Sequence, residues 1–373
     1  MLKKLAVLFA VLALVAAACG GDSDDAPEET TTTAATTETT PDSGQGTEGG
    51  TLAAVQAAGE LKCGVSTGAP GFTELAPDGT FSGIDVDFCR AVAAVVLGDS
   101  EAVEFRQLTS GERFAALASG EIDVLIRNTT WTQTRDTDLA QDFVQTTFFD
   151  GQQIMGDPAR LPGLTVEGGF ADIDGAVVCT NAGTTTEQNI KEGAEVAGVT
   201  ITLETVENFT EAIDKFIAGS CDIVTTDGSG LFGHRSANIA SGTPGAEDWV
   251  IFPEAPISKE PLGPVVREND SEWFDVIQWT VFATLIFEEN GVTSANVGDM
   301  MDVTPEIARL TGGDGEKQSG MGLAPDAFLN MVKQVGNYGE IYERNLGPIG
   351  LERAGSFNMQ WYDGGLMYAP PAR

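Results

Sequence analysis

Apolar positions along the chain follow two periods, one typical of strands and one typical of helices. Residues 61–65 (LKCGV) and 175–179 (GAVVC) are short apolar runs followed by glycine-containing loops, and both are predicted strands. Residues 86–96 and 273–287 have helical spacing, and the second range places four apolar residues on one core-facing stripe: Trp273, Ile277, Val281 and Leu285. Strands that alternate with helices predict an α/β protein with open, mainly parallel sheets.

A pattern in the first half of the chain recurs 99 residues later. Residues 114–128 and 213–227 both carry apolar residues at helical spacing, then Ser-Gly or Ala-Gly, and then a short apolar strand that runs into polar residues. A small residue followed by glycine is typical of a helix C-cap. The recurrence predicts two similar α/β units.

The two strands of this recurring pattern end in polar residues. Loops that follow strands carry the ligand groups of many α/β proteins. The second strand ends at Asp227, at the position where Asn128 ends the first. The loop after the first strand adds further candidates for a binding site: Arg127, Thr130, Trp131 and Arg135.

These residue types suit a small zwitterion. Arg135 and Thr130 offer a guanidinium and a hydroxyl to a carboxylate, and Asp227 offers an acceptor to an ammonium group. Residues 183–190 predict a helix start, where free N–H groups also attract anions, with one of three threonines near the cap: Thr184, Thr185 or Thr186. The simpler alternatives are a surface arginine at position 135 and an ordinary helix cap in 183–190.

The beginning of the chain has the pattern of a secretion signal. Two lysines precede an apolar run of 14 residues, Leu5 to Ala18, which is shorter than the roughly 20 residues that span a bilayer. We therefore predict a signal peptide over 1–18. LVAAAC resembles a bacterial lipobox, although Ala16 stands where leucine is preferred, so Cys19 is expected to be acylated.

Residues 19–50 are acidic, rich in threonine and almost free of apolar side chains. Such a composition cannot bury enough surface to offset its ordering entropy, which predicts a disordered tether between a lipid anchor and the rest of the chain. An untrimmed secreted N-terminus would explain the same composition.

Charge and cysteine content narrow the functional class. The formal net charge of −36 argues against nucleic acid or an anionic membrane surface as a partner. An even number of cysteines after Cys19 predicts disulfides, with three pairings open and buried free thiols as the alternative: Cys63, Cys89, Cys179 and Cys221. Their spacing does not suggest zinc, and we predict no metal.

Enzyme signatures are sparse. His234 is the single histidine, nothing near it resembles a nucleophile elbow, and we predict a polar surface residue. Residues 228–233 (GSGLFG) match GxGxxG, but the residues that follow offer neither an amphipathic helix nor a strand with an acidic end. We interpret this match as a coincidental turn and predict no catalytic residue and no cofactor.

A series of segments, from about Gly50 to the last residue, carries a more specific signal. In chain order they are DGTFSGIDVDFCRAVAAVVLGD, ERFAALASGEIDVLIRNTTWTQTRDT, FFDGQ, AGTTTEQN, CDIVTTDGSGL, ISKEPLGPVVREND, EWFDVIQWTVFATLIFEENGVTSANV, KQVGNYGEIYERNLGP and GGLMYAPPAR. Together they resemble the general L-amino-acid-binding proteins of polar amino acid ABC importers, in extracellular solute-binding protein family 3.

This resemblance implies the type II periplasmic-binding-protein fold. Two α/β lobes, each a mainly parallel sheet flanked by helices, would be joined by hinge crossings near 148–151 and 256–262. Lobe 1 is then expected to combine 51–149 with 260–373, and lobe 2 to comprise 150–259. The lobes would close on one amino acid in the cleft between them.

The resemblance also implies residue roles. Arg135 and Thr130 would hold the α-carboxylate together with Thr185 or its backbone N–H, and Asp227 and Asn128 would lie near the α-amino group. Disulfides Cys63–Cys89 and Cys179–Cys221 would each stay within one lobe and leave the hinge free.

The chain departs from the family pattern at two places. Ala69 stands where many relatives stack an aromatic residue on the ligand, unless Phe72 turns inward. Arg127 stands where relatives of narrower specificity carry a small hydroxyl residue. We therefore expect selectivity to depend on Arg127 and Trp131, with Arg127 reading polar or acidic side chains; a structural ion pair is the alternative for Arg127.

The implied function is capture of L-amino acids, polar or acidic, and their delivery to the permease subunits of an ABC transporter. The protein is expected to be a monomer, exported and attached to the cytoplasmic membrane through Cys19. The alternatives are an amino-acid-sensing surface receptor and a dehydratase or lyase on the same fold.

Overall fold

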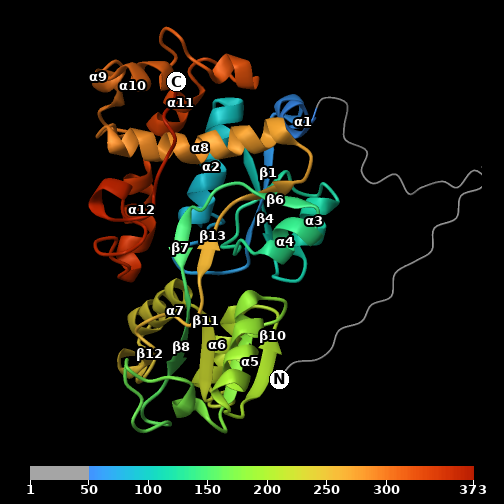
Figure 1. Ribbon diagram of the computed structural model, residues 1–373, viewed down its shortest axis with the longest axis vertical. Helices are drawn as coiled ribbons and strands as arrows, with labels where there is room; N and C mark the ends of the chain where they lie inside the picture. The colour runs from blue at the N-terminus through green and yellow to red at the C-terminus, as the bar shows by residue number, and fades with distance from the viewer. Residues whose placement is uncertain (1–49) are drawn as a thin grey trace, which may run out of the picture. The chain divides into compact units, whose positions relative to one another are not determined.

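The computed structural model describes residues 50–373, which form two five-stranded sheets with flanking helices (Figure 1). The predicted signal peptide, the predicted acylated Cys19 and the tether before Gly50 lie outside the described residues. Within the described part, no helix combines the length and apolar character that a membrane span requires.

The first sheet has the strand order β4-β1-β5-β14-β6. Strand β1 pairs in parallel with β4 and β5, whereas β14 runs antiparallel to both of its neighbours, so four of the five strands share one direction. The bounds are β1 (Leu61–Ser66), β4 (Val103–Leu108), β5 (Val124–Leu125), β6 (Gln141–Phe143) and β14 (Val265–Arg267). A small ribbon of β2 (Glu74–Leu75) and β3 (Phe81–Ser82) precedes the first long helix.

The second sheet has the corresponding order β10-β9-β11-β8-β12, with β8 as the antiparallel strand. Its strands are β8 (Gln152–Gly156), β9 (Val177–Asn181), β10 (Thr202–Val206), β11 (Ile223–Asp227) and β12 (Val250–Phe252). Its helices are η1 (Phe170–Ile173), α5 (Thr185–Ala197), α6 (Phe209–Ile217), α7 (Gly228–Ala240) and η2 (Ala246–Asp248). The expected mainly parallel sheets are confirmed in both halves.

Helices of the first half come from both ends of the described chain. They are α1 (Gly50–Ala58), α2 (Ile84–Leu97), α3 (Arg113–Ala118), α4 (Gln133–Asp138), α8 (Ser271–Glu289), α9 (Val297–Met300), α10 (Pro305–Leu310), η3 (Gln318–Met321), α11 (Ala327–Gln334), α12 (Tyr338–Leu346), η4 (Gly347–Ile349) and η5 (Trp361–Asp363). The predicted stripe on α8 is confirmed, because its four apolar residues are at most 1% exposed.

Two strands connect the halves. Strand β7 (Phe148–Asp150) pairs antiparallel with β13 (Glu260–Leu262), and both run between the two sheets in Figure 1. They occur where the hinge crossings were expected, so the two-lobed fold class is confirmed. We call the half with β1 the first lobe and the half with β9 the second lobe.

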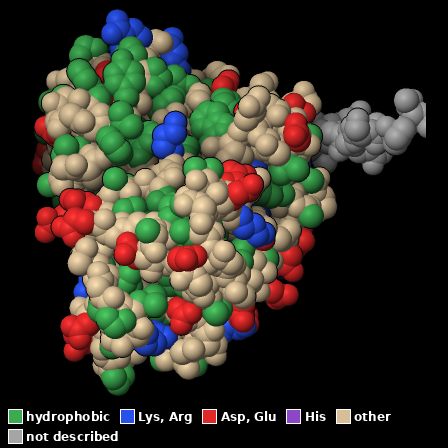
Figure 2. Space-filling view, turned by 60° about the horizontal axis from the view of Figure 1, so that its bottom comes forward, with side chains coloured by type: hydrophobic (Ala, Val, Ile, Leu, Met, Phe, Trp, Pro, Cys, Tyr) green, Lys and Arg blue, Asp and Glu red, His purple; other side chains and the backbone are tan. Residues whose placement is uncertain are grey.

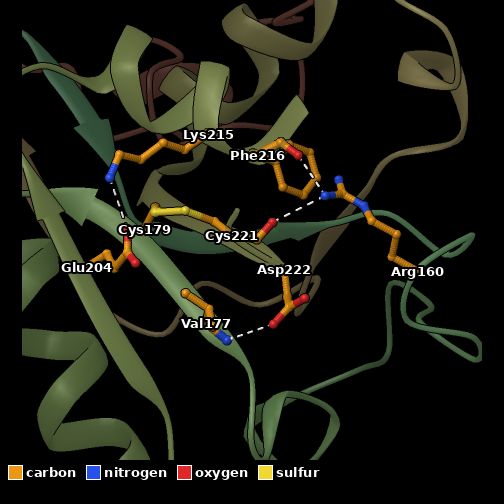
Figure 3. Close-up of a disulfide and its surroundings, with 8 residues drawn as sticks. All are labelled: Arg160, Val177, Cys179, Glu204, Lys215, Phe216, Cys221 and Asp222. Atoms are coloured by element: carbon orange, nitrogen blue, oxygen red, sulfur yellow. Dashed lines mark hydrogen bonds and ion pairs between the residues drawn. A yellow bond between two sulfur atoms is a disulfide. The ribbon is translucent and has the colours of Figure 1, made fainter. Parts of the chain in front are cut away.

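The internal recurrence extends to individual hydrogen bonds. Gly120 and Gly219 end their helices with φ of 76° and 75°, which favours glycine. The Asp123 carboxylate accepts a hydrogen bond from the Lys62 N–H at 2.8 Å, and the Asp222 carboxylate accepts one from the Val177 N–H at 2.8 Å (Figure 3). In both lobes, therefore, an aspartate at the corresponding position joins neighbouring strands.

A partly buried arginine reinforces each repeat. Arg267 Nη1 donates to the carbonyls of Leu117 and Ile122 at 3.1 and 2.8 Å. Arg160 Nη1 donates to the carbonyls of Phe216 and Cys221 at 2.6 and 3.2 Å, as Figure 3 shows. The accepting carbonyls are related by the same offset of 99 residues, although the two arginines are not. Arginines at unrelated sequence positions thus donate to the corresponding carbonyl groups at the helix end of each repeat.

The four cysteines form two disulfides, Cys63–Cys89 and Cys179–Cys221, with Cα atoms 6.0 and 5.9 Å apart. The pairing implied by the family resemblance is confirmed. Each bridge lies within one lobe, the second between β9 and the residues before β11 (Figure 3). Cys179, Cys221 and Glu204 lie close together, but the disulfide removes both thiolates as metal ligands.

The C-terminal segment is tied to the first lobe and to the hinge. The Arg353 guanidinium pairs with the Glu288 carboxylate, with Nη2 to Oε2 at 3.0 Å, and lies 4.8 Å from the centroid of the Tyr338 ring. The Asn358 side chain accepts from the Phe149 N–H at 2.7 Å and donates to the Phe149 carbonyl at 3.0 Å. This segment therefore fixes the outer edge of strand β7.

Acidic side chains are dispersed over the face drawn in Figure 2, with fewer basic groups among them. They do not form one continuous patch on that face. The surface therefore fits the solubility role expected from the negative net charge.

Candidate functional site

A cavity between the lobes gathers the polar ends of strands from both sheets. The first lobe contributes Ser66, Thr67, Gly68, Ala69, Ser110, Arg113, Arg127, Asn128, Thr130 and Arg135. The second lobe contributes Asn181, Thr184, Thr185, Thr186, Phe209, Thr226, Asp227, Gly230 and His234. All predicted ligand-binding residues except Trp131 line this cavity.

Arg135 is positioned by the first turn of α4. Thr132 caps this helix by accepting a hydrogen bond from the Arg135 N–H at 3.3 Å, and Arg135 Nη1 donates to the Thr130 carbonyl at 2.9 Å. Within the described residues no other group accepts a hydrogen bond from this guanidinium, which is 8% exposed. Burial lowers the pKa of Arg135, which still remains a cation, so its remaining donors are available to an anion.

The N-terminus of α5 faces the same cavity. Thr184, one of the three threonines that the sequence left open for this position, is the N-cap, and its hydroxyl accepts from the Glu187 N–H at 3.0 Å. The N–H groups of Thr185 and Thr186 have no acceptor among residues 50–373. Across the cleft, the hydroxyls of Thr130 and Thr185 are 3.4 Å apart, so the two lobes touch at this point.

Asp227 ends strand β11 and is 6% exposed. No described residue donates a hydrogen bond to its carboxylate. Burial, reinforced by the nearby Asp150 and Glu260 carboxylates, raises the pKa of Asp227 well above its usual value. A cation at this position would be the natural partner of the ionised form.

The two carboxylates near Asp227, those of Glu260 and Asp150, already accept hydrogen bonds from the protein. Glu260 accepts hydrogen bonds from the Thr185 hydroxyl and the Asn189 amide, both at 2.9 Å. Asp150 accepts from the Gly151 N–H at 2.8 Å and from the Ser229 hydroxyl, and burial raises the pKa of Asp150 to about 6. Asp227 is therefore the carboxylate of this group that is left for a ligand.

Asn128 adopts a left-handed backbone conformation with φ of 33°. Its N–H donates to Asp85 Oδ2 at 2.8 Å, and its side-chain oxygen is buried without a hydrogen-bond partner in the described chain. Burial raises the pKa of Asp85 to about 7. This bond fixes the turn that carries the strand end into the cavity.

Arg127 lines the cavity but is largely occupied by its own lobe. Its Nε donates to the Leu108 carbonyl at 2.9 Å and its Nη2 donates to the Ser110 hydroxyl at 3.1 Å. Burial lowers the pKa of Arg127 to about 10, so the side chain stays charged at neutral pH. The alternative interpretation of Arg127, a structural ion pair, finds no partner in the described residues, since no carboxylate lies within 4.0 Å of the guanidinium.

Trp131 lies outside the cavity. It is 39% exposed and stacks on Phe143, with ring centroids 5.8 Å apart. Its backbone N–H donates to the Pro261 carbonyl at 2.8 Å, which turns this part of the loop along the hinge strand. At the first loop, Ala69 lines the cavity, whereas Phe72 packs in the core with its ring 5.2 Å from that of Phe148.

Two interpretations of the sequence around His234 were wrong. The side chain is 7% exposed, lines the cavity and lies against Phe209 with ring centroids 5.1 Å apart. Burial lowers the pKa of His234 to about 4, so the imidazole is neutral. The GSGLFG segment is the beginning of helix α7, not a turn, and this helix carries His234 inward.

Sequence reasoning also missed Arg113, Ser110 and Phe209. Ser110 and Phe209 are related by the 99-residue offset, and both line the cavity near the start of a helix. The recurring pattern would have found this pair if it had been extended four residues upstream. Arg113, the first residue of α3, has no counterpart of its type in the second lobe, where Ala212 stands.

These features define a class of protein: two α/β lobes, linked by two strands, that enclose a charged cavity for a small solute. The sequence profile of the bacterial extracellular solute-binding proteins, family 3, matches residues 61–162. The glutamate/glutamine/aspartate/asparagine-binding protein BztA of Rhodobacter capsulatus is 45% identical over 328 residues, which cover 87% of this chain and 93% of that protein. The chain belongs to this family of solute-binding proteins.

Other relatives agree with this assignment. The general L-amino acid-binding periplasmic protein AapJ of Rhizobium johnstonii is 43% identical over 87% of this chain and 93% of its own. A periplasmic binding protein of an ABC transporter from Brucella ovis, solved with glutathione bound, has a TM-score of 0.80 and 43% identity, and covers 87% of this chain and 99% of its own. These relatives are named as binding proteins, not as enzymes.

A more distant structure matches only part of this chain. An ancestral arginine-binding protein bound to arginine has a TM-score of 0.53 and 28% identity, and its match covers 65% of this chain but 97% of its own. The two-lobed core is therefore shared with smaller amino-acid-binding proteins. About a third of the present chain has no counterpart in that structure.

Proposed function

We propose that this protein captures an L-amino acid between its lobes and delivers it to the permease of an ABC importer. The observation that carries the proposal is a pair of opposite charges in one cavity, the Arg135 guanidinium on the first lobe and the Asp227 carboxylate on the second, neither of which forms an ion pair within residues 50–373. An α-carboxylate and an α-ammonium group are the matching pair of a free amino acid. The names of the relatives support the same ligand class.

The remaining roles follow from the groups that are free. The N–H of Thr185 would join Arg135 and Thr130 on the α-carboxylate, because the Thr185 hydroxyl already donates to Glu260. Thr184 would act indirectly by capping α5, and Asn128 would lie near the α-ammonium group. Trp131 would have no direct role, in view of its exposure outside the cavity.

Transport would depend on lobe closure. We propose that residues 51–149 with 260–373 move against residues 150–259 about the β7–β13 ribbon. Ligand groups contributed by both lobes would favour the closed form, which the permease would recognise. Export by the segment 1–18 and acylation of Cys19 would keep the protein beside the membrane; both belong to the proposal, as does the monomeric state.

A longer ligand is a second candidate. A groove of about 690 Å³ shares Thr67, Gly68, Ala69 and His234 with the ligand cavity and continues along α7. Its other polar groups are uncharged or acidic, as at Gln107, Thr210 and Asp214, which suits an amide-linked extension. Glutathione, bound by the Brucella ovis relative, is the obvious probe.

Calorimetric titration with the twenty common L-amino acids and glutathione tests the proposal. Arg135→Ala should weaken every ligand by at least about 10- to 100-fold, because the charge-assisted bonds to the α-carboxylate are lost. Arg106→Ala is the matched control, since it removes the same charge from a side chain that is 43% exposed. Unchanged affinities in Arg135→Ala would contradict the proposed site, and glutathione binding without amino acid binding would favour the second candidate.

A further inference from the structure

A second cavity lies within the first lobe, between α8, α10, η3, α11 and the end of the chain. Its volume is about 220 Å³, and it shares no lining residue with the ligand cavity between the lobes. In Figure 1, α10, α11 and the chain end lie together on the side of α8 that faces away from the second lobe. A molecule bound here would therefore be remote from the interlobe cleft.

The inner lining of this cavity is apolar. Leu310 on α10 and Phe328 on α11 are its buried members, each 2% exposed. The half-buried side chains of Trp279 and Met321 complete the apolar lining. A cavity of about 150 Å³ with such a lining is large enough for benzene. A volume of about 220 Å³ therefore accommodates one aromatic ring with a short substituent.

Hydrogen bonds fix the elements around the cavity. The Gln318 side chain is 1% exposed, and its Nε2 donates to the carbonyls of Leu310 and Pro325 at 3.0 and 2.9 Å. The end of the chain is held against α10, because the Ala372 carbonyl accepts from Arg309 Nε at 2.8 Å. A ligand would meet a site that is already formed, which lowers the ordering cost of binding.

Three cationic side chains border the cavity: Arg309, Lys317 and Arg373. Among the described residues, no Asp or Glu side chain lines it, and no carboxylate lies within 4.0 Å of these three charges. Glu306, on the same helix as Arg309, instead accepts a hydrogen bond from the Ala372 N–H at 2.6 Å. The chain has 56 acidic residues against 20 lysines and arginines, so a cavity bordered by cations alone runs against its overall charge. Charge complementarity favours an anionic group at this border.

We propose that this cavity is a second binding site, separate from the interlobe cavity, for a small monocarboxylate with an aromatic or branched apolar body. The apolar body would contact Leu310 and Phe328, and the carboxylate would pair with Arg309 and Lys317. An α-ammonium group would find no lining carboxylate among the described residues, so free amino acids are not expected to compete for this site. The bound molecule would connect α10 and η3 to α8 and thereby stabilise the first lobe.

Titration calorimetry of the full chain with phenylacetate tests the proposal, with phenylacetamide as the uncharged match. Phenylacetate should bind with a Kd of about 10 µM to 1 mM, and phenylacetamide at least about tenfold more weakly, because the charge-assisted contacts are lost. Lys317→Glu should weaken phenylacetate by at least about fivefold. Lys333→Glu is the matched control, since it makes the same change on an exposed lysine that does not line the cavity, and it should leave Kd unchanged.

Met321→Trp tests the cavity without a change of charge. The larger ring would fill the apolar space and should abolish phenylacetate binding, while the affinity for amino acids stays at the wild-type value. Should this variant fail to fold, Lys317→Glu decides alone, because its side chain is exposed.

Three results would overturn the second site. The first is the absence of phenylacetate binding, or equal binding of phenylacetate and phenylacetamide. The second is loss of phenylacetate binding in Arg135→Ala, which would place the carboxylate between the lobes. The third is unchanged phenylacetate affinity in Lys317→Glu. None of these results bears on amino acid capture, which the titrations with L-amino acids test separately.

Discussion

Replacing Gly233 by alanine should weaken every ligand without changing their order. Gly233 lies on α7 of the second lobe, and a Cβ atom built there would be 2.9 Å from the Pro70 carbonyl oxygen and 3.0 Å from Pro70 Cβ in the first lobe. Ile349 of η4 would be 3.5 Å away. The glycine therefore permits a close contact between the lobes.

The magnitude follows from this geometry. Ordinary contact begins at 3.4 Å, so the lobes would have to separate by 3.4 − 2.9 = 0.5 Å at this point. The hydroxyls of Thr130 and Thr185, 3.4 Å apart across the cleft, are already at the limit of a hydrogen bond. Overpacking of this kind costs about 1–3 kcal/mol, which would lower the population of the closed form and raise Kd by roughly 5- to 150-fold.

Titration calorimetry with the preferred ligand and a weaker one measures the effect. The melting temperature without ligand should stay near the wild-type value, because the contact joins the lobes and not the core of either. Gly298→Ala is the control, since a Cβ atom on this helical glycine would meet nothing within 4 Å. Unchanged Kd in Gly233→Ala, or weakening of one ligand alone, would refute the role of this contact in closure.

Two further predictions concern a charge and a disulfide. Asp227→Asn should raise Kd by about 10- to 150-fold, because the α-ammonium group loses a charged acceptor. Burial raises the pKa of Asp227, so the folded state is stabilised by the proton and loses that stability as pH rises through the folded pKa. The ligand-free variant should therefore melt above wild type at pH 8, with a smaller difference at pH 4; a lower melting temperature at pH 8 would contradict this sign. Replacing both Cys179 and Cys221 by serine should lower the free energy of unfolding by about 2–4 kcal/mol, which calorimetry would record as a drop of roughly 5–15 °C in Tm. The ligand Kd should stay within about threefold of the wild-type value, because the disulfide is confined to one lobe. A large change in Kd would instead connect the disulfide to lobe closure.

Much of the architecture was predictable because it depends on local pattern. The stripe on α8 has the 3.6-residue period of a helix that is buried along one face, and the start of α5 was predicted to within three adjacent threonines, of which Thr184 is the cap. The 99-residue recurrence predicted two units with the same helix ends, and the structure adds that they share carboxylate and arginine contacts. The strand 175–179 was displaced by two residues, since β9 spans Val177–Asn181 and the preceding glycine forms a turn.

Only the tertiary structure decided which side chains of the site are already hydrogen-bonded within the protein and which remain free. Composition identified several arginines near strand ends, but whether a guanidinium is free depends on carbonyls brought from elsewhere, such as that of Leu108 beside Arg127. His234 is buried because the lobes meet over α7, a contact that no local pattern encodes. Trp131 turns outward because its backbone bonds to the hinge strand.

The sequence by itself therefore determined which elements form and which residue types end the strands, because hydrophobic period and helix capping act over a few neighbouring residues. Only the tertiary structure decided which charges remain unpaired in the cleft. Pairing of buried charges depends on distances of a few ångströms between groups that are far apart in the chain. Arg135 and Asp227 are left for a ligand for that reason.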